Sequence, residues 1–515
     1  MGARASSGYP PNVRFTRRQA LRTGAVAAAS WLAPGCADPT APTAEGFAWG
    51  VASGDPTTRS VILWTRLEVE IPTEVRIEVF RDPGATDRVV DTFALADPER
   101  DGCVKLDLEG LDPDTTYYYR FSALGTQSEL GRTRTLPEGR VERVRLAFVS
   151  CANFAFGHFH PYARLASRAD LSAVVHLGDS IYEYADGVYG GLRPLDPPWE
   201  TVTLSDYRRR YAHYRTDPDV RAVLRQHPFL PVWDDHEIAN NAHRIGAPAH
   251  DPLVHGPWEA RVAAARRAFF EWNPVRDEEG VHRVLALSDL ARLVLLDTRL
   301  DGRDPPPVDA ADWQRPDRRI MGSSQEASLL EAIARDDVVH TVLASQVFLS
   351  RVPVLANLDA WDGYPAQQAR VLAAIEAAPA LVSVMTGDQH ASYAFDLAGV
   401  GYDPVTRAGS IGVEWCMPAV ASPPLAPDPR EAERVLLEGT PHLRWTEQSS
   451  AGYVLLDLDR ERARAEWWFI EDATRVDGGA ERLARVFEQR ADDRASREVE
   501  PVPEAPIRPA PPLAP

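Results

Sequence analysis

The amino-acid sequence predicts an α/β protein preceded by a β-sandwich domain. Between residues 46 and 137, short apolar or alternating runs follow one another, separated by turns rich in Pro, Gly and Asp. Between residues 144 and 471, such runs alternate with segments of helical apolar spacing. Successive short strands are typical of a sandwich, and alternation with helices is typical of a sheet covered by helices.

The predicted sandwich domain occupies residues 46–140. Its clearest strands are Val61–Thr65, Glu74–Phe80 and Thr116–Ala123. The run Leu111–Tyr119 resembles the tyrosine corner of fibronectin-like sandwiches. Because this region contains no cluster of metal-ligand residues, we expect it to have a structural role and to carry no chemistry.

The α/β domain is predicted to span residues 144–485. Helical spacing marks five segments, which are Pro161–Arg168, Leu204–Arg215, Pro257–Glu271, Ser324–Arg335 and Ala366–Ala377. An antiparallel strand pair is expected at Gly452–Leu458 and Ala463–Ile470. Residues 498–515 are rich in proline, which predicts an extended or disordered tail.

Residues 1–36 predict an export signal. Thr16–Arg22, with its paired arginines, precedes the weakly apolar run Gly24–Leu32, a pattern typical of a twin-arginine signal. Its expected partner is the twin-arginine export machinery, and residues 37–45 look like a linker. The protein is therefore expected outside the cytoplasm: periplasmic, secreted or lipid-anchored. Membrane attachment is expected only if Cys36, which follows a sequence similar to a lipoprotein cleavage box, is lipidated.

Composition excludes several other classes of protein. The formal net charge of -19 argues against a nucleic-acid-binding surface. The cysteines are Cys36, Cys103, Cys151 and Cys416, and none forms a CxxC pair of the kind found in zinc ribbons. No run reaches the roughly 18 apolar residues that a membrane span requires.

Apolar runs that end abruptly in metal-ligand residues indicate the site. They are Val144–Val149 before Ser150-Cys151, Val174–Leu177 before Gly178–Tyr182, Pro231–Trp233 before Asp234–Glu237, and Leu381–Thr386 before Gly387–His390. In an open α/β sheet, ligands bind at the carboxyl ends of the strands, so these side chains should meet at one edge. Because buried unpaired carboxylates are costly, bound cations are the simplest way to hold them together.

Asp179, Tyr182 and Cys151 suggest a hard, highly charged ion. Asp179 and Tyr182 lie three residues apart, so a carboxylate that bridges two cations and a phenolate could share one ion. A phenolate suits Fe(III) better than zinc, whereas Tyr182 on its own would more often be a packed aromatic residue. A thiol at a strand end is normally a small buried apolar group, but metal binding would deprotonate it.

The two remaining runs offer mainly oxygen and nitrogen donors. Asp235 could bind a metal, His236 could hydrogen-bond a leaving oxygen, and Asn240 offers a carbonyl ligand and an amide donor. In isolation this segment would be an ordinary capped helix start. Asp388 and His390 form an i, i+2 pair, which on an extended segment would point both side chains to one side.

Together these motifs resemble the PhoD-type alkaline phosphatase/phosphodiesterase family of the metallophosphoesterase superfamily. The resemblance rests on Trp49–Pro56, Leu63–Arg66, Ser150-Cys151, Gly178-Asp179, Tyr182, Trp233–Glu237, Asn240-Asn241, Leu296–Arg299, Gln346, Trp361–Tyr364, Gly387–His390 and Gly452-Tyr453. It covers nearly the whole chain after residue 46. The chain departs from the family at Ala152-Asn153 and at Ala242-His243, which leaves substrate preference open but not the metal core.

The resemblance implies a four-layer metallophosphoesterase-type sandwich with an iron–calcium centre. Its expected Fe(III) ligands are Cys151, Asp179, Tyr182 and His390. Its expected ligands for one or two Ca²⁺ ions are the bridging Asp179 with Asp235, Asn240 and Asp388. His236, Asn240 and Tyr214 are the expected catalytic residues, with His236 at the leaving group and Tyr214 at the phosphate.

The resemblance predicts an exported metal-dependent phosphoesterase that hydrolyses phosphomonoesters, phosphodiesters or both through metal-activated water. A phosphodiesterase or phospholipase D-like activity on cell-wall or lipid phosphodiesters remains an alternative, because the same centre would serve it. A zinc or manganese site is the chemical alternative. A non-catalytic surface adhesin is disfavoured because all of the expected ligands are present.

Overall fold

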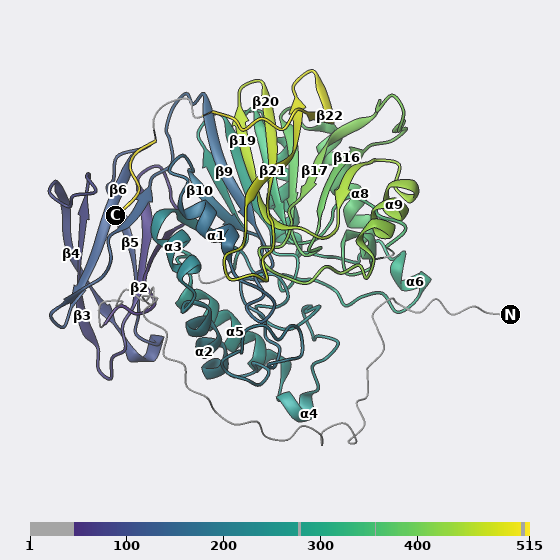
Figure 1. Cartoon of the computed structure of the whole chain (residues 1–515). Coiled ribbons are helices and arrows are strands. Elements are labelled where there is room, and N and C mark those ends of the chain that lie inside the picture. Colours follow the sequence, from purple (N-terminus) through teal and green to yellow (C-terminus); the bar gives the residue numbers. More distant parts are fainter. Residues whose placement is uncertain (1–45, 277–279, 356, 506–509) are drawn as a thin grey trace, which may run out of the picture. The chain divides into compact units, whose positions relative to one another are not determined.

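The computed structural model describes residues 46–276, 280–355, 357–505 and 510–515. These residues form sheets of ten, seven and five strands, which Figure 1 shows with their covering helices. The predicted export signal and linker, residues 1–45, lie outside the described residues.

The ten-stranded sheet combines the first three ligand-bearing strands with strands from both ends of the chain. Its order is β22 (Asp493–Val499), β21 (Glu481–Arg490), β20 (Arg462–Ile470), β19 (Ala451–Asp459), β9 (Arg143–Val149), β10 (Ala173–His176), β11 (Pro228–Pro231), β1 (Val51–Gly54), β2 (Ser60–Arg66) and β5 (Cys103–Glu109). Strands β9, β10 and β11 are parallel. The β19–β20 pair is antiparallel, as predicted. The sheet continues beyond residue 485, where the α/β domain was expected to end.

The seven-stranded sheet carries the fourth ligand-bearing strand. Its order is β12 (Arg283–Leu287), β13 (Ala291–Leu295), β14 (His340–Ser345), β15 (Leu381–Thr386), β17 (Ser410–Cys416), β16 (Ser392–Ala398) and β18 (Leu443–Glu447). The expectation of a single sheet edge for all four runs was therefore wrong. The strand ends meet, but across two sheets, because β15 pairs with β14 and β17 and not with β9–β11.

The two sheets pack face to face, with helices on their outer faces. Their shared core includes Phe148 and Leu455 from the ten-stranded sheet and Val342 and Trp415 from the seven-stranded sheet. The first sheet is contacted by α1 (His160–Ala166), α3 (Pro218–Gln226) and α5 (Trp258–Trp272), and α2 (Leu204–Tyr214) packs against α5. The second sheet is contacted by α7 (Ser323–Ala334) and α8 (Pro365–Ala377). Shorter or peripheral helices are α4 (Pro252–His255), α6 (Ala310–Trp313) and α9 (Pro429–Gly439). The predicted four-layer α/β class is confirmed.

The N-terminal sandwich is built into the larger sheet. Its second sheet contains β4 (Arg88–Ala96), β3 (Thr73–Phe80), β6 (Thr116–Ala123), β7 (Thr126–Gln127) and β8 (Gly131–Arg134). The facing layer is β1, β2 and β5, and Val61, Val75 and Val104 belong to the core between the layers. Because β1 pairs in parallel with β11, the same layer is also the edge of the α/β sheet.

The proline-rich tail lies against the rest of the chain. Residues 510–515 contain no helix or strand, yet the Ala514 backbone N–H and C=O each bond the Gln226 side-chain amide at 2.9 Å. The Tyr118 hydroxyl donates to the Pro512 carbonyl at 2.6 Å. These bonds fasten the tail to α3 and to the sandwich strand β6.

Helix α2 illustrates how local sequence positions groups behind the site. Thr203 and Asp206 form a capping box that fixes its start. Its buried face is Tyr207, Arg210, Tyr211 and Tyr214, which follow the spacing of one helix side. All five helices predicted from the sequence are observed, each within a few residues of its predicted bounds. They are α1, α2, α5, α7 and α8.

Candidate metal centre

The candidate ligands follow the carboxyl ends of four strands. Cys151 follows β9, Asp179 follows β10, the 234–237 turn follows β11, and Asp388 follows β15. Cys151, Asp179, Asp388 and His390 have φ values of 60°, 56°, 66° and 51°. Left-handed backbone costs about 1–3 kcal/mol per non-glycine residue and clusters at functional sites. Residues 388 and 390 are thus in a tight bend, and the expected extended segment was wrong.

A mixed set of sulfur, nitrogen and oxygen donors lies where the strand ends of the two sheets meet. Donor atoms of Cys151, Asp179 and His390 all lie within 4.8 Å of one another, and all three side chains are buried. The Tyr182 hydroxyl is 3.2 Å from Asp179 Oδ2 and 3.2 Å from His390 Nε2. The structure therefore brings together the four residues that were expected to surround one ion.

An oxygen-rich set adjoins the mixed set through Asp179. Donor atoms of Asp234, Asp235 and Asp388 lie within 4.8 Å of one another, and so do those of Asp179, Asp235 and His236. Asp234 Oδ2 and Asp235 Oδ1 are buried without a hydrogen-bond partner among the described residues. Buried carboxylate oxygens are normally satisfied, so these orphaned acceptors fit a hard cation that prefers oxygen ligands.

Arg299 is a charge partner that the sequence analysis did not assign. Its fully buried guanidinium bonds Asp234, and lies 2.5 Å from Asp359 Oδ2, 3.4 Å from Asp388 Oδ1 and 3.7 Å from Asp235 Oδ1. Leu296–Arg299 belongs to the motifs that resemble the family, but no local pattern indicates that this arginine faces the acids. Asp359 had no motif signal at all.

Glu237 cross-links two of the ligand turns. Its Oε2 accepts the Asp179 N–H at 2.9 Å and the Asp234 N–H at 2.8 Å, while its Oε1 accepts from Ser180 N at 2.6 Å and from Ser180 Oγ at 2.7 Å. The carboxylate thereby fixes the turn after β10 against the turn after β11. Its place in the Asp234–Glu237 run was noted from the sequence, but not this role.

Comparison with known proteins agrees with this arrangement. The model of the PhoD-like phosphatase family matches residues 146–467, and that of the PhoD-like phosphatase N-terminal domain matches residues 33–137. The chain belongs to the PhoD-like phosphatase family. It is 32% identical over 459 residues to alkaline phosphatase D of Bacillus subtilis (strain 168), covering 82% of this chain and 77% of that protein.

A solved structure of PhoD is similar as well. It superposes with a TM-score of 0.81 at 29% identity, covering 92% of this chain and 94% of that chain. The expected family and the expected phosphatase class of enzyme are thus confirmed. Among the described residues, no helix of this PhoD-like phosphatase is long and apolar enough to cross a membrane.

Burial sets the protonation of the mixed set in this PhoD-like phosphatase. Burial, reinforced by the charge of Asp179, raises the pKa of the Cys151 thiol and of the Tyr182 phenol well above their usual ranges. Burial lowers the pKa of His390 to about 4. A bound cation would oppose the first two shifts, because it stabilises thiolate and phenolate.

The acids of the oxygen set titrate differently from one another. Burial raises the pKa of Asp388 to about 6, although Arg299 opposes this shift. Burial also favours the neutral form of Asp235, but Arg299 and His236 outweigh it and lower the pKa of this carboxyl. Burial would lower the pKa of His236, yet the charges of Asp235 and Glu183 raise it well above its usual value.

Tyr214 and Asn240 lie beside the PhoD-like centre in less direct positions. The buried Tyr214 hydroxyl accepts the Phe154 and Tyr182 backbone N–H groups, each at 3.2 Å, so it holds the ligand segment from behind. Its expected contact with phosphate stays a prediction. The Asn240 N–H donates to Glu183 Oε1 at 2.7 Å, and the expected metal contact of its side chain stays a prediction as well.

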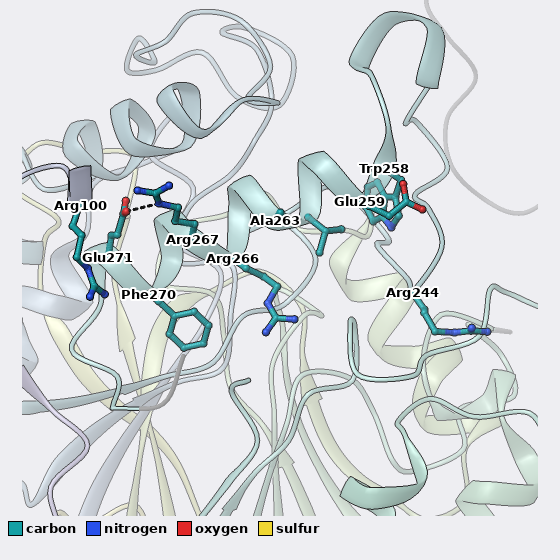
Figure 2. A pocket seen from close by; sticks show the side chains of 10 residues that line it. Arg100, Arg244, Trp258, Glu259, Ala263, Arg266, Arg267, Phe270 and Glu271 are labelled. Atoms are coloured by element: carbon teal, nitrogen blue, oxygen red, sulfur yellow. Dashed lines mark hydrogen bonds and ion pairs between the residues drawn. The ribbon is translucent and has the colours of Figure 1, made fainter. Parts of the chain in front are cut away.

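A separate groove of about 640 Å³ runs along α5, and Figure 2 shows the residues that line it. Arg267 Nε lies 2.9 Å from Glu271, and Arg244 lies 3.1 Å from Asp304, so these arginines are already paired with acids. The groove contains none of the metal-ligand candidates. The groove along α5 is therefore separate from the candidate metal centre at the strand ends.

Proposed function

We propose that this protein is an exported, metal-dependent phosphoesterase that hydrolyses phosphomonoesters, phosphodiesters or both. Cys151, Asp179, Tyr182 and His390 would hold Fe(III). Asp179, Asp235, Asn240 and Asp388 would hold one or two Ca²⁺ ions.

One observation carries the proposal: a thiol, a phenol, an imidazole and several carboxylates lie together, buried, where strand ends of the two sheets meet. The orphaned oxygens of Asp234 and Asp235 support a cation beside them. Thiol and phenol donors suit a trivalent ion, whereas the carboxylate set suits calcium. Proteins relieve such a concentration of buried acid by pairing it or by binding metal.

The bound ions would neutralise phosphoryl oxygens and lower the pKa of the attacking water. In this proposal His236 would give a proton to the departing oxygen as the bond from phosphorus to that oxygen breaks. The water oxygen would form the new bond to phosphorus, with one of its protons released to solvent and the other kept by the phosphate product. His236 would then regain a proton from solvent, so that the net reaction consumes one water. Arg299 and Glu237 hold the aspartates and turns in register during this exchange.

Export is the second part of the proposal. The paired arginines of Thr16–Arg22 and the following short apolar run support passage through the twin-arginine machinery, which carries folded proteins. The proposed ligands follow four strands that are far apart in the sequence, so the metals can bind only after the chain has folded. Export of the folded protein would allow the metals to be bound first. A membrane anchor would follow only from lipidation of Cys36.

The direct test is hydrolysis of a phosphomonoester and a phosphodiester by protein purified without chelator, with elemental analysis of the same sample. Activity at alkaline pH should disappear with a calcium chelator and return with calcium. An active enzyme containing only zinc would refute the iron–calcium assignment. Inactivity on both ester types with a full metal complement would refute the phosphoesterase function, and the ratio of the two rates measures ester preference.

A further inference from the structure

A short segment encloses the imidazole of His236. Tyr182, Glu183 and Tyr184 are consecutive residues, and we call them the Tyr-Glu-Tyr segment. The Tyr182 ring stacks on the His236 ring with centroids 4.3 Å apart and planes 29° apart. The Tyr184 ring lies 5.1 Å from it at 56°. The two aromatic rings leave the imidazole little freedom to rotate.

Glu183 completes this enclosure with a hydrogen bond. Glu183 is only 2% exposed, and its Oε2 lies 2.7 Å from His236 Nδ1. A carboxylate at Nδ1 fixes both the ring orientation and the nitrogen that carries the hydrogen. Nδ1 is thereby occupied, which leaves Nε2 as the nitrogen available to the reacting group.

The second oxygen of Glu183 reaches the same turn further along. Oε1 accepts the backbone N–H of Asn240 at 2.7 Å. One buried carboxylate therefore holds both the proposed proton donor and the turn that carries a proposed calcium ligand. A change at Glu183 would disturb both together.

The segment is itself anchored from behind. The Tyr214 hydroxyl accepts the Tyr182 N–H at 3.2 Å, and the buried Arg210 guanidinium bonds the Tyr182 carbonyl and lies 3.0 Å from the Tyr184 carbonyl. Backbone bonds on both sides of Glu183 fix the origin of its side chain. Two side chains of α2 therefore fix the backbone on which the Glu183 carboxylate is carried.

We propose that Glu183 is a positioning residue for phosphoester hydrolysis, holding His236 with Nε2 directed at the leaving oxygen. The proposal rests on the function proposed above, in which His236 serves the leaving group. It assigns Glu183 no contact with substrate. Substituting Glu183 is predicted to lower kcat most for esters whose leaving group is most basic.

The experiment compares phosphate esters of graded leaving-group basicity, from p-nitrophenol to a simple alcohol, with calcium in excess and metal content measured. Glu183→Gln should lower kcat for the alkyl ester by on the order of 10–100-fold, and for the p-nitrophenyl ester by much less. His236→Ala should show the same selectivity. The double variant should be little slower than His236→Ala alone, because the carboxylate acts through the histidine.

Glu414→Gln is the matched control. Glu414 is also fully buried and accepts the Leu349 and Ser350 N–H groups and the Thr386 hydroxyl, but it bonds no histidine among the residues that the structure describes. We expect this variant to lose stability. Any fall in its kcat relative to the unaltered enzyme should be the same for every ester in the series. If Glu183→Gln does not fold, Glu183→Asp shortens the same carboxylate and provides the same comparison.

Three results would overturn the positioning role, and they show whether the proposed function fails with it. If His236→Ala shows leaving-group selectivity but the Glu183 variants slow every ester equally, the positioning role of Glu183 is overturned and the proposed function stands. If the double variant multiplies the two single losses, the role is likewise overturned. If His236→Ala shows no selectivity, the proposed role of His236 fails, and the positioning role fails with it.

Discussion

A Cβ atom added at Gly178 would lie 2.3 Å from the Cβ of Asp234. Real Cβ atoms do not approach so closely, so the turn after β10 and the turn after β11 meet only because residue 178 has no side chain. Gly178 also has a φ of 99°, which favours glycine. Two of the ligand turns of the centre therefore depend on one missing methyl group.

Replacing Gly178 with Ala should destabilise the protein and displace Asp179 or Asp234. Gly110→Ala is a matched control, because Gly110 has a φ of 79° but no atom within 4 Å of the added Cβ. Left-handed strain of roughly 1–2 kcal/mol applies to both variants, while overpacking adds about 1–3 kcal/mol only at Gly178. Thermal unfolding and metal content measure the difference. Equal losses in the two variants would contradict the steric argument.

Asp388→Asn and His236→Ala should separate metal binding from catalysis. Asp388→Asn removes a full charge from the oxygen set, so calcium affinity should fall on the order of tenfold or more. His236→Ala should keep its metals and lose about 10²–10⁴-fold in rate, as expected for a lost general acid. Elemental analysis and kcat distinguish them. Metal loss from His236→Ala equal to that from Asp388→Asn would make His236 a ligand instead.

Tyr182→Phe should change the colour of the protein without unfolding it. A phenolate bound to Fe(III) absorbs visible light by charge transfer, and the substitution removes only the oxygen. Tyr184→Phe is the control, because Tyr184 lies beside the same histidine but outside the proposed ligand set. Absorption spectra of the two variants decide the matter. An unchanged spectrum in Tyr182→Phe would exclude this phenolate as the source of the colour.

His227→Gln should make the free energy of unfolding depend less steeply on pH under acidic conditions. Burial lowers the pKa of His227 from 6.5 to about 3, so the native state holds it neutral. As pH falls from 6.5 towards 3, the unfolded chain binds a proton that the native state refuses, and stability falls. The slope is up to about 1.4 kcal/mol per pH unit for one such group. Chemical unfolding between pH 7 and 4 should show a shallower slope in the variant; identical slopes would rule the assignment out.

Replacing Arg17 and Arg18 together with Lys should block export. The twin-arginine pathway requires the paired arginines, whereas other routes need only positive charge. Cell fractionation should find the precursor in the cytoplasm, while an unaltered sequence yields processed protein outside. Normal processing of the variant would disprove the proposed route. Mass spectrometry of the mature N-terminus would show whether Cys36 carries lipid.

The strand ends could be predicted because their signals are local. The run before Asp179 and the run before Cys151 are short, β-branched and closed by polar residues, and their strands are observed. The division of the four runs between two sheets could not be predicted, because pairing partners such as β15 and β17 are not encoded in either segment alone.

The supporting residues were missed for a related reason. Glu183 lies 53 residues from His236 in the sequence, and Arg299 lies 65 residues from Asp234. Each looks like an ordinary surface charge until the fold buries it against an opposite partner. For Tyr214, the two backbone N–H groups that its hydroxyl accepts could not be foreseen from the sequence, and its expected contact with phosphate stays a prediction.

The parallel pairing of β1 with β11 limits where the chain can be divided into separate folded parts. A cut between residues 137 and 146 falls between two family models, yet it would leave β11 with an open edge and divide one hydrogen-bonded ladder. The segment that carries no ligands therefore supplies the strand that covers this edge of the metal-bearing sheet. A fragment that begins after residue 137 should expose the backbone groups of β11 and be prone to aggregation.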